Sequence, residues 1–162
     1  MDQKNQLAFR IATFFGAGLA PKAPGTVGSL AALPLVVATN HLPLYGAVLV
    51  WLGILGLGIW ASAQVFQHSG VRDDSRIVID EVLGMGVTLI GVEPKQWILF
   101  GVGFALFRLF DIWKPPPICY LDQFSKLSTS PWKVGWGVMA DDLAAGLLAA
   151  VILRAIAPGI VP

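Results

Sequence analysis

GVMADDLAAGLLAAVILRAIA, residues 137–157, combines two features that rarely occur together: adjacent acids and a long apolar helix. Asp141 and Asp142 stand directly before eleven uncharged residues, which run from Leu143 to Leu153. A buried carboxylate is costly unless it is paired with a base or bound to a metal. The stretch therefore predicts a membrane helix that carries a functional acidic group near its start.

The composition of the whole chain indicates an integral membrane protein. Its 162 residues suggest one domain, spanning residues 1–162. Hydrophobic residues make up 56% and charged residues only 13%, about half the charged fraction of an average soluble domain. The 49 positions between Lys22 and Arg72 carry no Lys, Arg, Asp or Glu. No basic block is present, so we expect no nucleic-acid partner, and nothing in the pattern specifies an oligomer.

Hydrophobic runs separated by polar turns predict an all-α, polytopic bundle of four to five spanning helices, since each span needs about 20 residues. The N-terminal segment 7–20, LAFRIATFFGAGLA, is shorter and contains Arg10, so we expect an interfacial helix, with a sixth span as the alternative. KPPP lies within a polar stretch, 111–133, and no helix can run through it. The predicted spans are residues 25–39, 44–66, 77–92, 96–110 and 138–157.

If each predicted span crosses the membrane once, most charged residues lie on one side of it. Nine of the eleven basic residues fall on one face, and only Lys95 and Arg154 fall on the other, which places the first face in the cytoplasm. Glu93 is the one acid predicted on the opposite face. The acids on or near the cytoplasmic face are Asp73, Asp74, Asp80, Glu81, Asp111, Asp122, Asp141 and Asp142.

Four motifs converge on that face, and their residue types suggest phosphate chemistry on a lipid. Grouped carboxylates repel one another, and a hard divalent cation such as Mg²⁺, Mn²⁺ or Ca²⁺ relieves that repulsion. Arg108, Asp111 and Lys114 are spaced to share one helical face, where two bases can bind a phosphate. Thr26 and Ser29 open the first span, where backbone N–H groups and hydroxyls face an anion. The motifs are APGTVGSL (23–30), RDDSRIVIDEVLGM (72–85), FRLFDIWKPPPI (107–118) and GVMADDLAAG (137–146).

Each motif also has a plainer structural interpretation. The tandem aspartates could cap a helix, Arg108 and Asp111 could form an ordinary intrahelical ion pair, and Thr26 and Ser29 could be ordinary helix-start residues. Asp73 and Asp74 could lie in a solvated loop, an interpretation that we favour for Asp74. A small ion-coupled transporter or channel is the alternative function. It predicts acids that face a pore at mid-membrane depth and acids spread over both faces.

Together the four motifs resemble the phosphatidylglycerophosphatase A family, in the family's order and from about Phe15 to Gly146. The resemblance implies a Mg²⁺-dependent lipid phosphatase of the bacterial inner (cytoplasmic) membrane, with its active site facing the cytoplasm. Such an enzyme hydrolyses the terminal phosphate of phosphatidylglycerophosphate, a phospholipid in the membrane, to give phosphatidylglycerol. Direct attack by water and a covalent phospho-enzyme both remain open. The motif of the rival CDP-alcohol phosphatidyltransferases, D-G-x-x-A-R followed by G-x-x-x-D-x-x-x-D, is absent.

The resemblance also implies roles for individual residues. The residues with implied catalytic roles are Asp80, Glu81, Asp111, Asp141 and Asp142. Those implied as Mg²⁺ ligands are Asp80, Glu81, Asp141 and Asp142. The residues implied to bind the substrate phosphate are Thr26, Ser29, Arg108 and Lys114. Asp73 and Asp122 are implied to support the metal ligands from behind. The stretch QFSKLSTSPWKVGW after Asp122 is longer than usual for the family and lacks its usual glycine pair.

Overall fold

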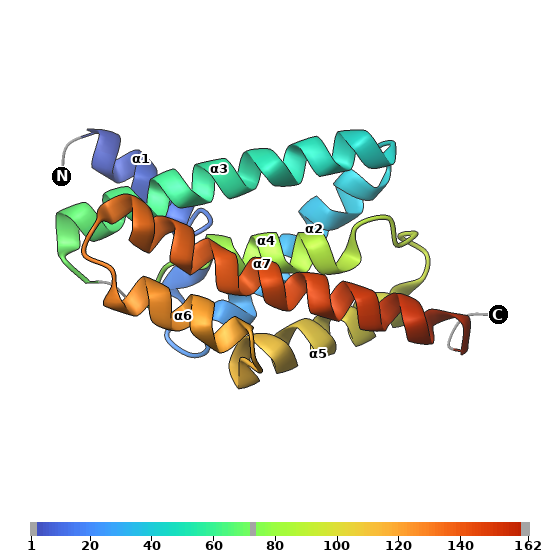
Figure 1. Cartoon of the computed structure of the whole chain (residues 1–162). Coiled ribbons are helices and arrows are strands. Elements are labelled where there is room, and N and C mark those ends of the chain that lie inside the picture. The colour runs from blue at the N-terminus through green and yellow to red at the C-terminus, as the bar shows by residue number, and fades with distance from the viewer. Residues whose placement is uncertain (1–2, 72–73, 160–162) are drawn as a thin grey trace.

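The computed structural model describes residues 3–71 and 74–159, and over these ranges its regular structure is helical, without strands (Figure 1). The all-α prediction is confirmed. The α-helices are α1 (Gln3–Ala12), α2 (Pro24–Asn40), α3 (Leu44–Ser69), α4 (Ile79–Leu89), α5 (Trp97–Trp113), α6 (Ile118–Leu127) and α7 (Pro131–Ile156). Short 3₁₀ turns follow α1 and α7, at η1 (Ala17–Leu19) and η2 (Ala157–Gly159).

The helices α2, α3, α4, α5 and α7 run alternately in opposite directions, so their connections collect at the two ends of the bundle (Figure 1). Helix α7 is central, because it contacts α3, α4, α5 and α6. Where α4 crosses α7, a Cβ atom on Gly146 would lie 2.6 Å from the carbonyl oxygen of Gly84. Glycine at this crossing therefore lets the two backbones approach closely.

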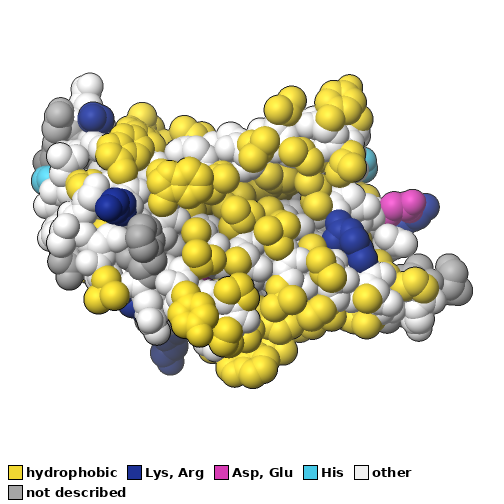
Figure 2. Space-filling view, viewed as in Figure 1, with side chains coloured by type: hydrophobic (Ala, Val, Ile, Leu, Met, Phe, Trp, Pro, Cys, Tyr) yellow, Lys and Arg dark blue, Asp and Glu magenta, His cyan; other side chains and the backbone are white. Residues whose placement is uncertain are grey.

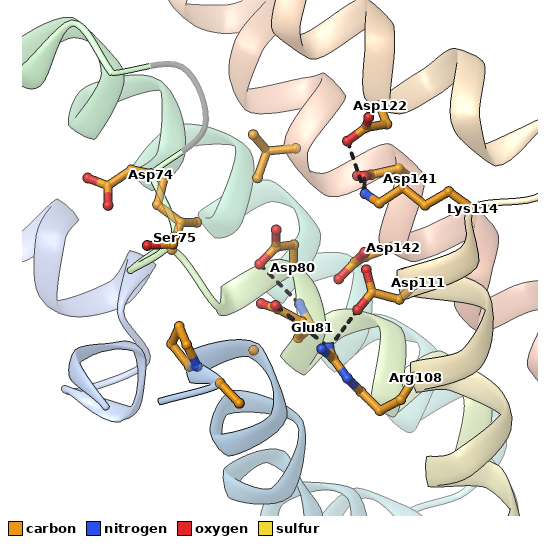
Figure 3. Close-up of a pocket in the computed structure, with 15 residues that line it drawn as sticks. Asp74, Ser75, Asp80, Glu81, Arg108, Asp111, Lys114, Asp122, Asp141 and Asp142 are labelled. Atoms are coloured by element: carbon orange, nitrogen blue, oxygen red, sulfur yellow. Dashed lines mark hydrogen bonds and ion pairs between the residues drawn. The ribbon is translucent and has the colours of Figure 1, made fainter. Parts of the chain in front are cut away.

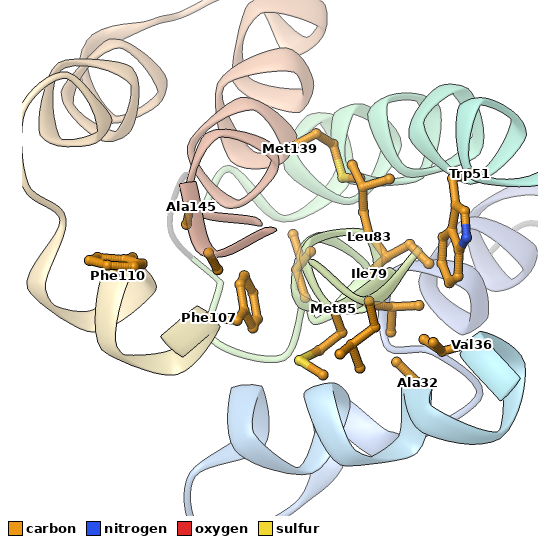
Figure 4. Packing of buried hydrophobic residues seen from close by; sticks show 14 of the residues in the cluster. Ala32, Val36, Trp51, Ile79, Leu83, Met85, Phe107, Phe110, Met139 and Ala145 are labelled. Atoms are coloured by element: carbon orange, nitrogen blue, oxygen red, sulfur yellow. The ribbon is translucent and has the colours of Figure 1, made fainter. Parts of the chain in front are cut away.

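The core lies between α2, α3, α4, α5 and α7 (Figure 4). Phe107, Leu83, Met85 and Met139 are all fully buried there. Large apolar side chains are also exposed along the outer helices, and Figure 2 shows them spread across the middle of one face, with charged side chains toward its ends. This distribution is the one expected of a membrane-associated protein.

Within residues 3–71 and 74–159, two helices are long and apolar enough by themselves to cross a membrane, Leu44–Ser69 and Pro131–Gly159. The other predicted spans are shorter helices. Helix α4 has only 11 residues instead of the predicted 77–92, and most of them are buried against neighbouring helices. Hydrophobic periodicity located α4, but it did not distinguish a buried helix from one that faces lipid.

The structure differs from the prediction in two helix bounds and adds one helix. Residues 7–20 do not form one helix, because Phe14 and Phe15 adopt positive φ angles of 44° and 54° after α1 ends. The polar stretch 111–133 contains a helix, α6, that begins directly after the prolines. Helix α7 begins at Pro131 rather than at 138, because proline is well suited to the first position of a helix.

Candidate functional site

A cavity of about 290 Å³ lies where α2 and α4 begin, where α5 ends and where α6 and α7 pass (Figure 3). All four sequence motifs contribute to it. The residues that line the cavity are Ala23, Pro24, Gly25, Asp74, Ser75, Ile77, Asp80, Glu81, Arg108, Asp111, Lys114, Asp122, Val138, Asp141 and Asp142.

Three carboxylates in the cavity are placed to share a cation. Asp80 and Glu81 open α4, and Asp142 faces them from α7, so that one oxygen from each lies within 4.8 Å of the others. Glu81 Oε2 and Asp142 Oδ2 are buried and make no hydrogen bond with the described residues. Uncompensated buried carboxylate oxygens are the donor set that a hard divalent cation requires, so these residues fit Mg²⁺.

The tandem aspartates point in different directions, because adjacent helical residues are rotated by about 100°. Asp142 faces Asp80 and Glu81, whereas Asp141 accepts a hydrogen bond from Lys114 (Figure 3). The three-carboxylate group therefore contains Asp142 without Asp141. Asp141 belongs to a second group, although its Oδ1 atom is also buried without a hydrogen-bond partner among the described residues.

Lys114 joins α5, α6 and α7 through this second group. Its Nζ atom donates to Asp141 and, at 3.0 Å, to Asp122 Oδ1, and Lys126 donates to Asp122 Oδ2, also at 3.0 Å. Burial opposes the charge on Lys114, but Asp141 outweighs that effect and raises the Lys114 pKa above its ordinary value. Burial likewise opposes ionisation of Asp122, and the two lysines outweigh it, so the pKa of Asp122 is lowered.

Arg108 connects Asp111 and Ser29 to Glu81, one of the three carboxylates. Its Nη1 atom lies 2.5 Å from Asp111 Oδ2, 3.8 Å from Glu81 Oε1 and 3.5 Å from the hydroxyl oxygen of Ser29. The intrahelical pair with Asp111 therefore exists, but it is part of a larger network. The sequence predicted that Arg108, Asp111 and Lys114 share one helical face, and for Lys114 this prediction is wrong. Helix α5 ends at Trp113, and Lys114 has a φ of 47° before the prolines.

The start of α2 forms one wall of the cavity through Ala23, Pro24 and Gly25. A Cβ atom on Gly25 would lie 2.0 Å from Glu81 Oε1, so glycine leaves room for that carboxylate. The first N–H groups of a helix have no intrahelical partner and can face an anion. Thr26, although predicted to bind phosphate, is not among the described residues that line the cavity, and Ser29 reaches the site only through Arg108.

Asp74 contradicts the solvated-loop interpretation, because only 9% of it is exposed. Its carboxylate accepts hydrogen bonds from Arg76 Nε at 2.9 Å and Arg76 Nη2 at 2.7 Å, and it lines the cavity. The bond from Arg76 lowers the pKa of Asp74. Ser75 also lines the cavity. The sequence did not predict this, because a serine within a polar loop has no distinctive pattern. Asp73 lies outside the described residues.

The fold and the site define an all-helical, membrane-associated protein whose acidic cavity suits a hard cation and a phosphate. A family model described as Phosphatidylglycerophosphatase A matches residues 10–157. The chain therefore belongs to the phosphatidylglycerophosphatase A family, as the four motifs predicted.

Individual relatives agree with this membership. A protein from Escherichia coli K12 named phosphatidylglycerophosphatase A is 41% identical over 145 residues, which cover 88% of this chain and 79% of the relative. A protein of the same name from Haemophilus influenzae is 37% identical over 147 residues, covering 90% and 86%. A Bacteroides thetaiotaomicron protein is 34% identical over 160 residues, covering 94% and 95%, and its name proposes a phosphatidylinositol-3-phosphatase.

No solved structure matches the chain. The family membership and these relatives support an enzyme, so the prediction of catalytic function is confirmed. The alternative of a transporter or channel is not favoured.

Proposed function

We propose that the chain hydrolyses the terminal phosphate of phosphatidylglycerophosphate, giving phosphatidylglycerol and inorganic phosphate, with Mg²⁺ as cofactor. The observation that carries the proposal is the group of Asp80, Glu81 and Asp142, which combines buried, uncompensated oxygens with a neighbouring arginine. The substrate class follows from the names of the relatives in Escherichia coli and Haemophilus influenzae.

The chain's own residues can each be given a part in this reaction. Asp80, Glu81 and Asp142 would hold Mg²⁺, which when bound neutralises phosphate oxygens and favours ionisation of water. Arg108 would bind a phosphate oxygen by exchanging part of its contact with Asp111 for the substrate. The N–H groups at the start of α2, which lies beside Glu81 and Arg108, would help to orient the phosphate. A water oxygen forms the new bond to phosphorus while the bond from phosphorus to the glycerol oxygen breaks, and that oxygen takes a proton.

We further infer a multi-pass protein of the bacterial inner membrane whose active site faces the cytoplasm. Four to five crossings are supported by the alternating directions of α2, α3, α4, α5 and α7, although α4 is too short to cross a bilayer alone. The positive-inside pattern supports the orientation, because nine of the eleven basic residues belong to segments assigned to the cavity end of the bundle. A cavity at that end would meet the lipid headgroup.

The test is phosphate release by the full chain in detergent micelles, with and without Mg²⁺. We expect turnover of phosphatidylglycerophosphate that Asp142→Asn and Glu81→Gln each lower by at least about 100-fold, a typical scale for removing one electrostatic contact to the reacting group. Glu93→Gln is the matched control, because Glu93 pairs with Lys95 outside the cavity. Undiminished turnover by folded Asp142→Asn would refute the assigned site.

A substrate panel tests the lipid assignment separately. Phosphatidylinositol 3-phosphate belongs in it because of the Bacteroides relative. Faster release from that lipid than from phosphatidylglycerophosphate would reassign the substrate and leave the proposed site in place. Phosphate release that depends on the cavity residues but not on Mg²⁺ would instead overturn the assignment of Mg²⁺ as the cofactor.

A further inference from the structure

A second pocket, whose lining residues differ from those of the acidic cavity, lies between α1 and the last turns of α3. It is made of two adjoining hollows of about 270 and 320 Å³, which share Asn5, Gln64 and His68. Lys4 and Gln67 line one hollow, and Arg76 with Phe9 lines the other. Figure 1 shows α1 lying against this end of α3.

The charge of this pocket is opposite to that of the acidic cavity. Its lining supplies hydrogen-bond donors from Lys4, Arg76, His68 and three amide side chains, and no acid is among its described lining residues. The side chains of Lys4, Asn5, Gln64, Gln67 and His68 make no hydrogen bond or ion pair with the described residues. Six donor side chains that line one pocket suit a ligand with several anionic oxygens, such as a phosphate group.

Arg76 links this pocket to the acidic cavity. Its Nε and Nη2 atoms donate to Asp74, which lines the cavity, while the guanidinium carbon lies 5.1 Å from the centre of the Phe9 ring. These contacts hold the guanidinium at the pocket that it lines, and its Nη1 atom has no hydrogen-bond partner among the described residues. Apolar groups border the donors, since Phe9 and Val65 line the pocket and Leu7 is exposed nearby on α1.

We propose that this pocket is a non-catalytic binding site for a phosphate group, which an anionic phospholipid headgroup or free phosphate could supply. The donors would bind the phosphate oxygens, and the apolar border would accept the first carbons of an attached lipid. A phosphate held there contacts Arg76, whose partner Asp74 belongs to the loop leading into Asp80 and Glu81. The site is therefore separate from the hydrolytic one, and the Arg76–Asp74 ion pair connects the two.

Native mass spectrometry of the full chain from nanodiscs would test the proposal. One arm uses equal parts of phosphatidylcholine and phosphatidylglycerol, and the other uses phosphatidylcholine alone with added inorganic phosphate. The double variant Lys4→Ala/His68→Ala removes donors from the pocket. The double variant His41→Ala/Lys95→Ala is the matched control, because it makes the same residue changes at the other end of α3 and in the turn before α5.

We expect the wild type and the control to retain phosphatidylglycerol, and Lys4→Ala/His68→Ala to bind it at least about tenfold more weakly. The same variant dependence with inorganic phosphate alone would support the site and identify free phosphate as its ligand. Equal binding by the wild type and Lys4→Ala/His68→Ala in both arms would overturn the proposal. If that variant does not fold, the exposed substitution Gln67→Ala replaces it, with the same outcomes.

Discussion

Replacing Gly146 by alanine should disturb the active site through the crossing of α4 and α7. A Cβ atom at this position would lie 2.6 Å from the backbone oxygen of Gly84, and ordinary contacts begin at 3.4 Å. The two helices must therefore separate by about 0.8 Å, because a backbone oxygen cannot turn aside as a side chain can. Gly146 lies one turn after Asp142, and Gly84 lies three residues after Glu81.

The displacement gives an expected magnitude for two measurements. Overpacking of this kind costs about 1–3 kcal/mol in the free energy of unfolding. Catalytic groups must be held within about 0.5 Å of their productive geometry, and a 1 Å misplacement can lower the rate about 100-fold. Because the shift acts directly on Asp142 and Glu81, we expect turnover to fall roughly 10- to 100-fold in a protein that still folds.

Phosphate release and thermal unfolding in the same detergent measure these effects. Gly53→Ala is the control, because Gly53 is an exposed helical glycine with nothing within 4 Å of its added Cβ atom. It should keep wild-type turnover and unfold at the same or a higher temperature. If Gly146→Ala kept wild-type stability and turnover, the close crossing would not position the carboxylates as argued.

Three further predictions concern the charges around the cavity. Lys114→Gln leaves the buried Asp141 without its base and should lower the free energy of unfolding by about 1–3 kcal/mol. Lys126→Gln, the control at an exposed lysine, should lower it by less than about 1 kcal/mol. Equal losses in the two variants would contradict the argument. Chelation of divalent cations should abolish phosphate release and added Mg²⁺ should restore it, so release that survives chelation would exclude a metal requirement. The bond from Arg76 lowers the pKa of Asp74 below its ordinary 3.8, so this carboxylate stabilises the fold above about pH 4 and loses that effect as the pH falls through its lowered pKa. Asp74→Asn should therefore destabilise the protein at neutral pH and much less in acid; a difference in unfolding temperature that does not change with pH would refute the linkage.

The sequence predicted which segments meet, because acids set into apolar helix ends need partners. Asp80, Glu81, Arg108 and Asp142 do lie in one cavity, although they come from three helices. The all-α architecture followed from hydrophobic runs of helical length. The number of spanning helices did not, because the short, buried α4 has the same apolar pattern as a helix that faces lipid.

Other features depend on contacts that the sequence pattern does not encode. Whether Asp141 or Asp142 faces the three-carboxylate group depends on how α7 is rotated, and the repeated residue gives no preference. Asp74 lies in the polar sequence RDDSR, which is typical of a solvated loop. In the structure it is buried, bonded to Arg76 and part of the cavity lining, and none of these contacts can be read from the pattern. Helix α6 lacks a long apolar run, so the search for hydrophobic spans did not identify it within the polar stretch 111–133.

The balance of charge explains why a cation and a phosphate belong together in this cavity. Among the described residues, seven acids and two bases line it. Asp74, Asp111, Asp122 and Asp141 each contact a base, whereas Asp80 and Asp142 contact none among the described residues, and Glu81 lies 3.8 Å from an arginine already bound by Asp111. A phosphate entering such a site would be repelled by like charge. A divalent cation held by these three carboxylates would reverse that repulsion, which is why we propose Mg²⁺ as part of the site that binds the substrate.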